Sequence, residues 1–333
     1  MSQLNSELKG IKLMWQRIKD QPKILVMTCL VIGLVVGMTA WTVSQEGKWY
    51  PSIWGVDDQR GALNRLTPEK VLEAVSLIKT GKVYELGRTY EDVMPLFGTR
   101  HFSLRIPQMS GPLGDNKVTW HEEIFSGEIG QVGTQFDGLA HIGIGDLYYN
   151  GLPQSEIATA EGFVKLGMEN VGAIVTRGVL IDVVGYKGVE YLEDKYEITA
   201  EDLKGTLRKQ GTPIRPGDVV LIHTGWGRFW ITDNERYNES EPGIGLDAGK
   251  YLVEQGIVMV CADNWAIEVV PNPDESIAFP VHQLFLPQNG IYNLENVITE
   301  ELAKDEVYEF AFIFTPLKLK GATGSPGSPI AIR

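Results

Sequence analysis

The spacing of apolar positions changes along the chain, and each spacing predicts a different kind of element. Residues 24–43 form one uncharged apolar run, whereas the chain beyond it carries short apolar runs separated by glycine and polar residues. Apolar residues at helical spacing after Thr-Pro-Glu or Thr-Ala-Glu-Asp indicate capped helices, and short β-branched runs indicate buried strands. Helices are predicted over 67–81, 199–211 and 246–255, and strands over 102–106, 173–175, 179–183, 219–222 and 257–260.

The repeated order of helix, glycine and apolar strand predicts an α/β domain. No internal repeat or linker divides residues 44–333, so they are expected to form a single domain. Residues 48–64 are rich in aromatic residues and turn formers, and they predict a non-regular segment packed on the domain. Residues 233–242 are polar and predict a surface loop.

The first 43 residues predict a membrane anchor. A run of twenty apolar residues at about 1.5 Å each matches a hydrocarbon core of about 30 Å. Residues 1–23 carry five basic and two acidic side chains, which favours a cytoplasmic basic segment, a transmembrane helix over 24–43 and an extracytoplasmic (periplasmic) domain. A cleaved secretory signal is the alternative, and it predicts a secreted or periplasmic protein.

Charge and cysteine content narrow the possible functions. The net charge of -13 argues against a nucleic-acid partner, which would require a basic face. The two cysteines permit neither a disulfide framework nor a CxxC metal site. The acidic charge also suggests a substrate that is neutral or is met by local cations. A small-molecule substrate is expected, and histidine and carboxylate side chains are left as the candidates for chemistry.

The most informative polar segment is 130–145, GQVGTQFDGLAHIGIG. It places Gln131, Gln135, Asp137 and His141 among small residues. The first three are oxygen donors suited to a divalent cation, and His141 can exchange a proton near neutral pH. A glycine-rich turn with polar caps is the alternative interpretation of the same residues.

This segment resembles the HxGTHxDxPxH motif of the cyclase family, which includes bacterial kynurenine formamidases and isatin hydrolase. Gly133, Thr134, Asp137 and His141 match the motif. Gln131 and Gln135 occupy its first two histidine positions, and Leu139 replaces the proline. Further matches follow in the family's order: WGxxD at 54–58, RGVL at 177–180, GDVVL at 217–221 and GATGSP at 321–326.

The resemblance implies a cyclase-like (swivelling β/α type) fold with a mixed sheet and flanking helices, and frequent homo-oligomers. It further implies that Asp137, His282 and Glu295 hold a divalent metal cation, and that His141 is the catalytic acid/base. His282 as a buried hydrogen-bonded histidine and Glu295 as a helix-start residue are the alternatives.

Glutamine in two histidine positions implies a harder and weaker metal site than imidazole provides. Mn²⁺ or Mg²⁺ is expected to tolerate this change better than Zn²⁺, and the choice between Mn²⁺ and Zn²⁺ as the bound metal stays open. Gln135 or Gln131 is expected to assist the metal, with a hydrogen bond to substrate as the alternative role.

Two further residues are candidates for substrate binding. Trp265 could stack on a flat substrate, and His223 could line the pocket, although a packing role is an equally ordinary explanation for each. The cluster His121-Glu122-Glu123 is a weaker metal candidate, because neighbouring residues on a strand point to opposite faces.

Together, these residues predict a metal-dependent hydrolase that opens a small amide, lactam or lactone with metal-activated water. An arylformamidase-like reaction on a carbon–nitrogen bond and the opening of a cyclic ester are both expected reactions. Two alternatives belong to other classes: a catalytically idle membrane-anchored binding module, and a dehydratase or polyketide cyclase.

Overall fold

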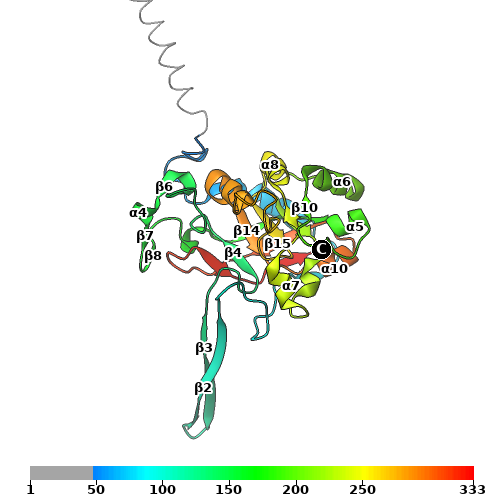
Figure 1. Cartoon of the computed structure of the whole chain (residues 1–333). Coiled ribbons are helices and arrows are strands. Elements are labelled where there is room, and N and C mark those ends of the chain that lie inside the picture. The colour runs from blue at the N-terminus through cyan, green and yellow to red at the C-terminus, as the bar shows by residue number, and fades with distance from the viewer. Residues whose placement is uncertain (1–47) are drawn as a thin grey trace, which may run out of the picture. The chain divides into compact units, whose positions relative to one another are not determined.

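A mixed sheet of nine strands organises the domain in the computed structural model, which describes residues 48–333 (Figure 1). Its four inner strands β9, β11, β13 and β14 run parallel, and antiparallel strands complete both edges. In spatial order the strands are β1 (Val83–Glu85), β17 (Ile330–Ile332), β15 (Glu309–Phe314), β9 (Ile174–Asp182), β11 (Val219–His223), β13 (Met259–Ala262), β14 (Tyr292–Glu295), β4 (Gln135–Asp137) and β16 (Gly324–Pro326). The α/β domain with a mixed sheet is therefore confirmed.

Short helices and two-stranded pieces surround this sheet. The helices are α3 (Pro68–Ser76), α4 (Gln154–Ile157), α5 (Val183–Lys187), α6 (Ala200–Gln210), α7 (Asn234–Glu239), α8 (Leu246–Glu254), α9 (Pro280–Gln283), α10 (Glu300–Lys304), the π-helix η5 (Leu284–Asn289) and the 3₁₀ turns η1 (Gly61–Arg65), η2 (Tyr149–Gly151), η3 (Met168–Asn170) and η4 (Trp226–Phe229). The small strand pairs are β5 (Leu147–Tyr148) with β6 (Leu152–Pro153), β7 (Ala158–Thr159) with β8 (Gly162–Phe163), and β10 (Glu197–Ile198) with β12 (Gly243–Ile244).

The predicted helix starts are confirmed in atomic detail. The Thr67 hydroxyl accepts the backbone N–H of Lys70, and Pro68 opens α3. Thr199 and Asp202 cap α6 reciprocally, and Gly211 ends α6 in the left-handed region with φ 68°. A side chain that accepts an orphan N–H stabilises a helix start by about 1 kcal/mol, which is why these signals are readable from sequence.

Helix α3 does not bury the apolar residues that predicted it. Leu72 is 68% exposed and Val75 is 49% exposed, whereas Lys70 and Ala74 face the domain. The Lys70 ammonium lies 2.6 Å from an Asp218 oxygen, and that carboxylate also pairs with Arg177. A buried ion-pair network thus fixes the rotation of the helix, because leaving Asp218 unpaired would be costly.

Two apolar runs that predicted separate strands belong to the single strand β9. The intervening Arg177 and Gly178 are buried, because Arg177 pairs with Asp218 and Glu309. A Cβ atom on Gly178 would lie 2.2 Å from the Phe310 ring, so glycine is needed for β15 to pack beside it.

The prediction of a surface loop over 233–242 is wrong in its secondary structure, although Asp233, Glu235 and Glu239 are exposed. Asp233 caps the helix α7, whose Tyr237 is buried. The segment then places the buried Glu241 carboxylate where it accepts the backbone N–H groups of Trp265 and Ala266. The polar Glu241 thus takes part in an internal hydrogen-bond network. Composition alone did not distinguish such a residue from one that is exposed to solvent.

Strands β2 (Phe102–Leu113) and β3 (Val118–Gly127) form a hairpin that extends away from the rest of residues 49–333, and we call it the arm (Figure 1). The predicted strand at 102–106 is the beginning of β2. Large apolar side chains are exposed on the arm: Leu104, Ile106, Leu113, Val118, Trp120, Ile124 and Phe125.

The predicted transmembrane helix over 24–43 and the basic segment before it lie outside the described residues. Among residues 48–333, none of the helices combines the length and the apolar character that crossing a bilayer requires.

Candidate metal centre

Strand β4 presents its polar residues to one face and its apolar residue to the other. Gln135 and Asp137 alternate with Phe136, whose ring stacks on Tyr292 in the core at 5.1 Å between centroids. Register with β14 places Glu295 opposite Gln135 and Asn293 opposite Asp137. Because side chains of a paired register share a face, two short strands gather four polar side chains on one buried surface.

Three of the predicted ligands converge on this surface. Ligand atoms of Asp137, His282 and Glu295 all lie within 4.8 Å of one another, and the three side chains are buried. The Nε2 atom of His282 lies 3.2 Å from Glu295 Oε1 and 3.7 Å from Asp137 Oδ2. Within residues 48–333 this is the one group of three histidine, cysteine or acidic residues with such spacing.

Glu268 fixes the orientation of His282. Its Oε1 atom lies 2.6 Å from His282 Nδ1, and the same carboxylate accepts the backbone N–H groups of Val281 and His282 at the start of α9. A carboxylate on one ring nitrogen directs the other nitrogen toward a cation, and this arrangement accompanies metal-binding histidines generally.

The two glutamines contact Glu295 through their amide nitrogens. Gln135 donates to Glu295 Oε2, and Gln131 donates to the same oxygen at 3.3 Å. Gln131 has a left-handed backbone with φ 53°, which is uncommon for a residue with a side chain. The amide nitrogens therefore hold the carboxylate in one position. The Oε1 atom of Gln131 accepts a hydrogen bond from Arg100, whereas the Oε1 atom of Gln135 takes no part in these contacts.

Unpartnered polar atoms indicate what the centre lacks. Both oxygens of Asp137 and the Oε1 atom of Gln135 are buried without a hydrogen-bond partner. Burial and the negative charge of Asp137 raise the pKa of Glu295 to about 8. Buried polar atoms almost always have partners, and a cation would satisfy these oxygens and neutralise the crowded carboxylates. The residues present therefore fit a divalent metal ion.

His141 lies beside this group at the wall of a cavity of about 590 Å³. Its Nε2 atom is 3.6 Å from Asp137 Oδ1, and its side chain is 21% exposed. Burial lowers the pKa of His141, which favours the neutral imidazole that can accept a proton. The cavity is also lined by Arg100, by Gln135 and Asp137, and by the glycine-rich segment 321–324.

The two residues predicted to contact substrate lie elsewhere. The Trp265 ring stacks on Phe97 at 4.3 Å and is 3% exposed, and it does not line the cavity of His141. His223 Nδ1 lies 2.7 Å from the Thr299 hydroxyl and 3.2 Å from Asp263, also away from that cavity. Their substrate contacts stay predictions.

Sequence reasoning did not single out Arg100, Asn293 or the role of Glu268 in orienting His282. Asn293 is fully buried on the ligand face, and neither polar atom of its side chain has a partner. The alternation Tyr-Asn-Leu-Glu in β14 is a signal that could have found it, because it puts Asn293 and Glu295 on one face.

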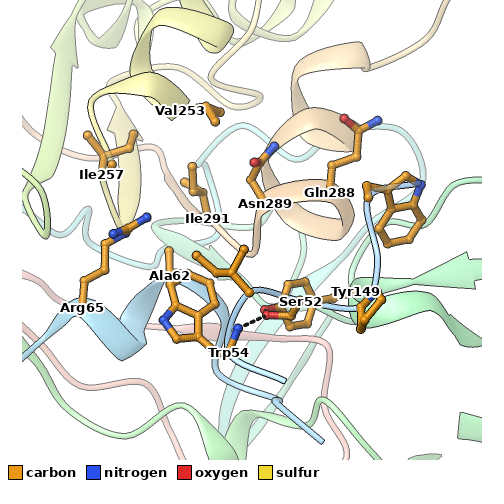
Figure 2. A pocket seen from close by; sticks show the side chains of 14 residues that line it. Ser52, Trp54, Ala62, Arg65, Tyr149, Val253, Ile257, Gln288, Asn289 and Ile291 are labelled. Carbon is orange, nitrogen blue, oxygen red and sulfur yellow. Dashed lines mark hydrogen bonds between the residues drawn. The ribbon is translucent and has the colours of Figure 1, made fainter. Parts of the chain in front are cut away.

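A second, smaller cavity of about 140 Å³ lies near the start of the described chain (Figure 2). The labelled side chains of Trp54, Arg65 and Tyr149 line it together with residues from η5 and α8. No histidine or carboxylate lines this cavity, so its wall lacks the side chains that most often hold a divalent cation.

Comparison with known proteins gives a consistent assignment. A family profile described as "Putative cyclase" matches residues 84–269, a span that includes Asp137 and His141 and ends before His282. No curated protein matches the chain.

Several solved structures share the fold, and three of them illustrate the likeness. A structure titled as a novel cyclase is 36% identical, covers 84% of this chain and 96% of its own, and has a TM-score of 0.75. Isatin hydrolase A from Ralstonia solanacearum is 19% identical, with 80% and 98% coverage and a TM-score of 0.58. Isatin hydrolase A from Labrenzia aggregata, bound to benzyl benzoate, is 20% identical, with 75% and 93% coverage and a TM-score of 0.53.

Proposed function

The chain belongs to the cyclase family, and on that premise we propose that it is a metal-dependent hydrolase of a small amide, lactam or lactone. The observation that carries the proposal is the buried group of Asp137, His282 and Glu295 beside His141 and a cavity. The isatin hydrolases share only the fold, so the bond that is cleaved rests on the site and not on them.

Each residue has a distinct task in the proposed reaction. Asp137, His282 and Glu295 would hold the cation, with Glu268 orienting His282 and the two glutamine amides orienting Glu295. A divalent cation supplies Lewis-acid chemistry there, polarising a carbonyl and lowering the pKa of water. His141 Nε2 would accept a proton from the attacking water and return it to the leaving nitrogen or oxygen, a step that contributes about 10²- to 10⁴-fold in rate.

The direct test combines metal analysis with a substrate panel. Purified full-length protein is analysed for bound metal, then assayed with formamides, lactams and lactones under added Mn²⁺ or Zn²⁺. We expect about one metal ion per chain and hydrolysis that disappears in Asp137→Asn. Metal-free protein that gains no activity with either ion would contradict the proposal and favour an idle binding module.

A ring-forming or dehydrating reaction is the second candidate function, because the 36% identical relative is titled a cyclase. The same residues could move a proton without consuming water. Product mass separates the two functions: hydrolysis adds 18 Da per turnover (a property of water), whereas cyclisation by dehydration removes it. ¹⁸O incorporation from labelled water would support hydrolysis.

We also propose that the protein is a homo-oligomer that buries the arm against a second copy. An isolated two-stranded hairpin is marginally stable in water, yet the arm exposes aromatic and aliphatic side chains along β3. The 12 residues of β2 and the 10 of β3 together fall at the lower end of the roughly 20–30 residues that each partner contributes to a stable interface.

The predicted location is likewise a proposal. The apolar run 24–43 and the basic residues before it favour a single-pass anchor with the catalytic domain outside the cytoplasm. Protease accessibility of the domain in intact cells or spheroplasts tests this topology, and release of the domain by carbonate washing would instead favour a cleaved signal.

A further inference from the structure

One cation lies at the wall of the catalytic cavity without a carboxylate partner. Arg100 lines the cavity together with Asp137 and His141. Its Nη1 atom donates to the backbone oxygen of Phe97 at 3.1 Å, and its Nη2 atom donates to Gln131 Oε1 at 2.9 Å. Both acceptors are neutral, so neither balances the guanidinium charge.

The remaining donors of Arg100 are available. A guanidinium has five N–H groups in a planar fork, and two hydrogen bonds are formed here. Within residues 48–333 no carboxylate forms an ion pair with Arg100, and none of its nitrogens is buried without a partner. In contrast, the buried Arg177 pairs with both Asp218 and Glu309, as expected for a structural arginine.

The position of Arg100 is fixed from two sides. Its guanidinium lies over the Phe97 ring at 5.4 Å, and that ring stacks on the buried Trp265. On the other side, Gln131 is held in its left-handed conformation next to the bridge between Val132 and Leu96. A pre-positioned planar cation suits bidentate binding of a carboxylate, because little side-chain freedom is lost on binding.

The electrostatics agree with this placement. Burial is the largest influence on His141 and lowers its pKa, and the positive charge of Arg100 acts in the same direction. The proximity of Arg100 to the reacting region rests on the cavity itself, whose wall contains Arg100, Asp137 and His141. Glu128 also lines the cavity, but its Oε2 atom lies 3.0 Å from His101 Nδ1 and accepts the backbone N–H of His101.

We propose that Arg100 is an anion-binding residue of this cavity, and that the substrate carries a carboxylate or an equivalent planar anion next to its reacting carbonyl. The reacting carbonyl would lie toward Asp137 and His141, with the anionic group at Arg100. The orientation of the substrate in the cavity rests on the proposed hydrolase function. The inference adds the class of substrate, which is a small organic anion.

The test measures charge discrimination without turnover. Full-length, Mn²⁺-loaded protein is titrated calorimetrically with benzoate and with its neutral isostere nitrobenzene, neither of which has a hydrolysable bond. We expect benzoate to bind about 10- to 100-fold more tightly, the strength of hydrogen bonds to a charged group. In Arg100→Met this ratio falls to about one, and in Arg100→Lys it is partly retained.

Two further measurements separate substrate binding from a positioning role. Arg105→Met removes an exposed arginine of the arm and should leave the ratio unchanged. Manganese affinity should be unchanged in Arg100→Met. If Arg100 acts only by holding Gln131 and Glu295, the variant loses manganese instead, and the inference is overturned.

The inference also fails if wild-type protein does not prefer benzoate, or if Arg100→Met keeps the preference. Each of these results stands independently of hydrolysis. If the protein hydrolyses neutral amides and has no charge preference, the proposed hydrolase function stands and the anion-binding role of Arg100 fails. If the protein prefers benzoate through Arg100 but hydrolyses nothing, the anion-binding role stands and the hydrolase function fails.

Discussion

The Nδ1 atom of His282 lies 2.6 Å from the Oε1 atom of Glu268, and this contact is buried on both sides. It determines which nitrogen of His282 faces Asp137 and Glu295. The backbone N–H groups at the start of α9 hold Glu268 in turn, so ligand orientation is built into the junction between a loop and a helix.

Glu268→Gln should weaken metal binding without preventing folding. Glutamine keeps one oxygen for the α9 backbone but removes the charge that makes His282 a better ligand. We expect manganese affinity to fall about 10- to 100-fold, the usual cost of losing such a partner. Calorimetric titration with Mn²⁺ measures this, and the exposed Glu275→Gln serves as the control. Equal affinity in wild type and Glu268→Gln would show that the contact has no role in metal binding.

Asp137→Asn should separate metal binding from stability. The Asp137 oxygens are buried without hydrogen bonds and lie near the Glu295 carboxylate, so removing the charge should raise the thermal midpoint of metal-free protein. The same variant should lose the stabilisation by Mn²⁺, which is about 2.7 kcal/mol at a metal concentration 100-fold above Kd.

Thermal unfolding with and without Mn²⁺ measures both effects of Asp137→Asn. Asp115→Asn, at the exposed tip of the arm, is the matched control and should behave as wild type. Persistent stabilisation of Asp137→Asn by Mn²⁺ would place the cation elsewhere.

His141→Gln should retain bound metal and lose turnover. His141 is 3.6 Å from Asp137, at the cavity wall, so it can exchange a proton without being needed to hold the cation. We expect kcat to fall about 10²- to 10⁴-fold at unchanged metal content. His101→Gln alters an exposed histidine and is the control. Near-normal kinetics in metal-loaded His141→Gln would exclude the acid/base role.

A feature could be predicted from residue patterns only where the residues that form it are close together in the sequence. The caps at Thr67 and Thr199 involve residues three positions apart, and both were predicted. The contact between Gln131 and Glu295 joins residues 164 positions apart, and only the family resemblance linked them. The orienting role of Glu268 required the path of the chain between β13 and α9, which no local pattern specifies.

Other features were predicted wrongly, because a hydrophobic pattern does not show which charged side chains are buried. Arg177 interrupts an apolar run and therefore suggested two strands, yet its pairing with Asp218 lets β9 continue through it. Lys70 is buried under α3 for the same reason, which leaves Leu72 exposed. The alternation at 102–106 predicted a strand correctly, but could not reveal that Leu104 and Ile106 are exposed.

The pair of His223 and Asp263 should make stability depend on pH. Burial acts to lower the pKa of His223, but the hydrogen bond and charge of Asp263 outweigh it, and the pKa is raised. Burial acts to raise the pKa of Asp263, which is nevertheless lowered by His223 and Thr224. The other charged groups that favour protonated His223 are Asp182 and Glu300.

The direction of the pH dependence follows from the pKa shifts of His223 and Asp263. The stability from His223 is fully present below its unfolded pKa of about 6.5 and is lost as pH rises through its higher folded pKa. The stability from Asp263 is fully present above its unfolded pKa of about 3.9 and is lost as pH falls through its lower folded pKa. The free energy of unfolding should therefore fall above about pH 6.5, by at most about 1.4 kcal/mol per pH unit for this one proton.

Urea unfolding at several pH values tests the pair by comparison with His223→Gln. The difference in unfolding free energy between wild type and variant should shrink as pH rises from 6 to 9. Other titrating groups affect both proteins equally, so they cancel in this difference. A constant difference over that range would mean that His223 is not protonated in the folded protein.

We expect a second copy of the chain to bury the arm. Replacing apolar residues of the arm should then separate the copies and expose the arm to solvent. Trp120→Glu with Ile124→Glu places charges on one face of β3 that would be buried in an oligomer. We expect a smaller mass by light scattering and faster amide hydrogen exchange over 118–127, at an unchanged thermal midpoint of the domain core. Leu72→Glu, on the exposed face of α3, is the matched control. An arm that exchanges equally fast in wild type and variant is uncovered, and the oligomer, if there is one, then forms through another surface.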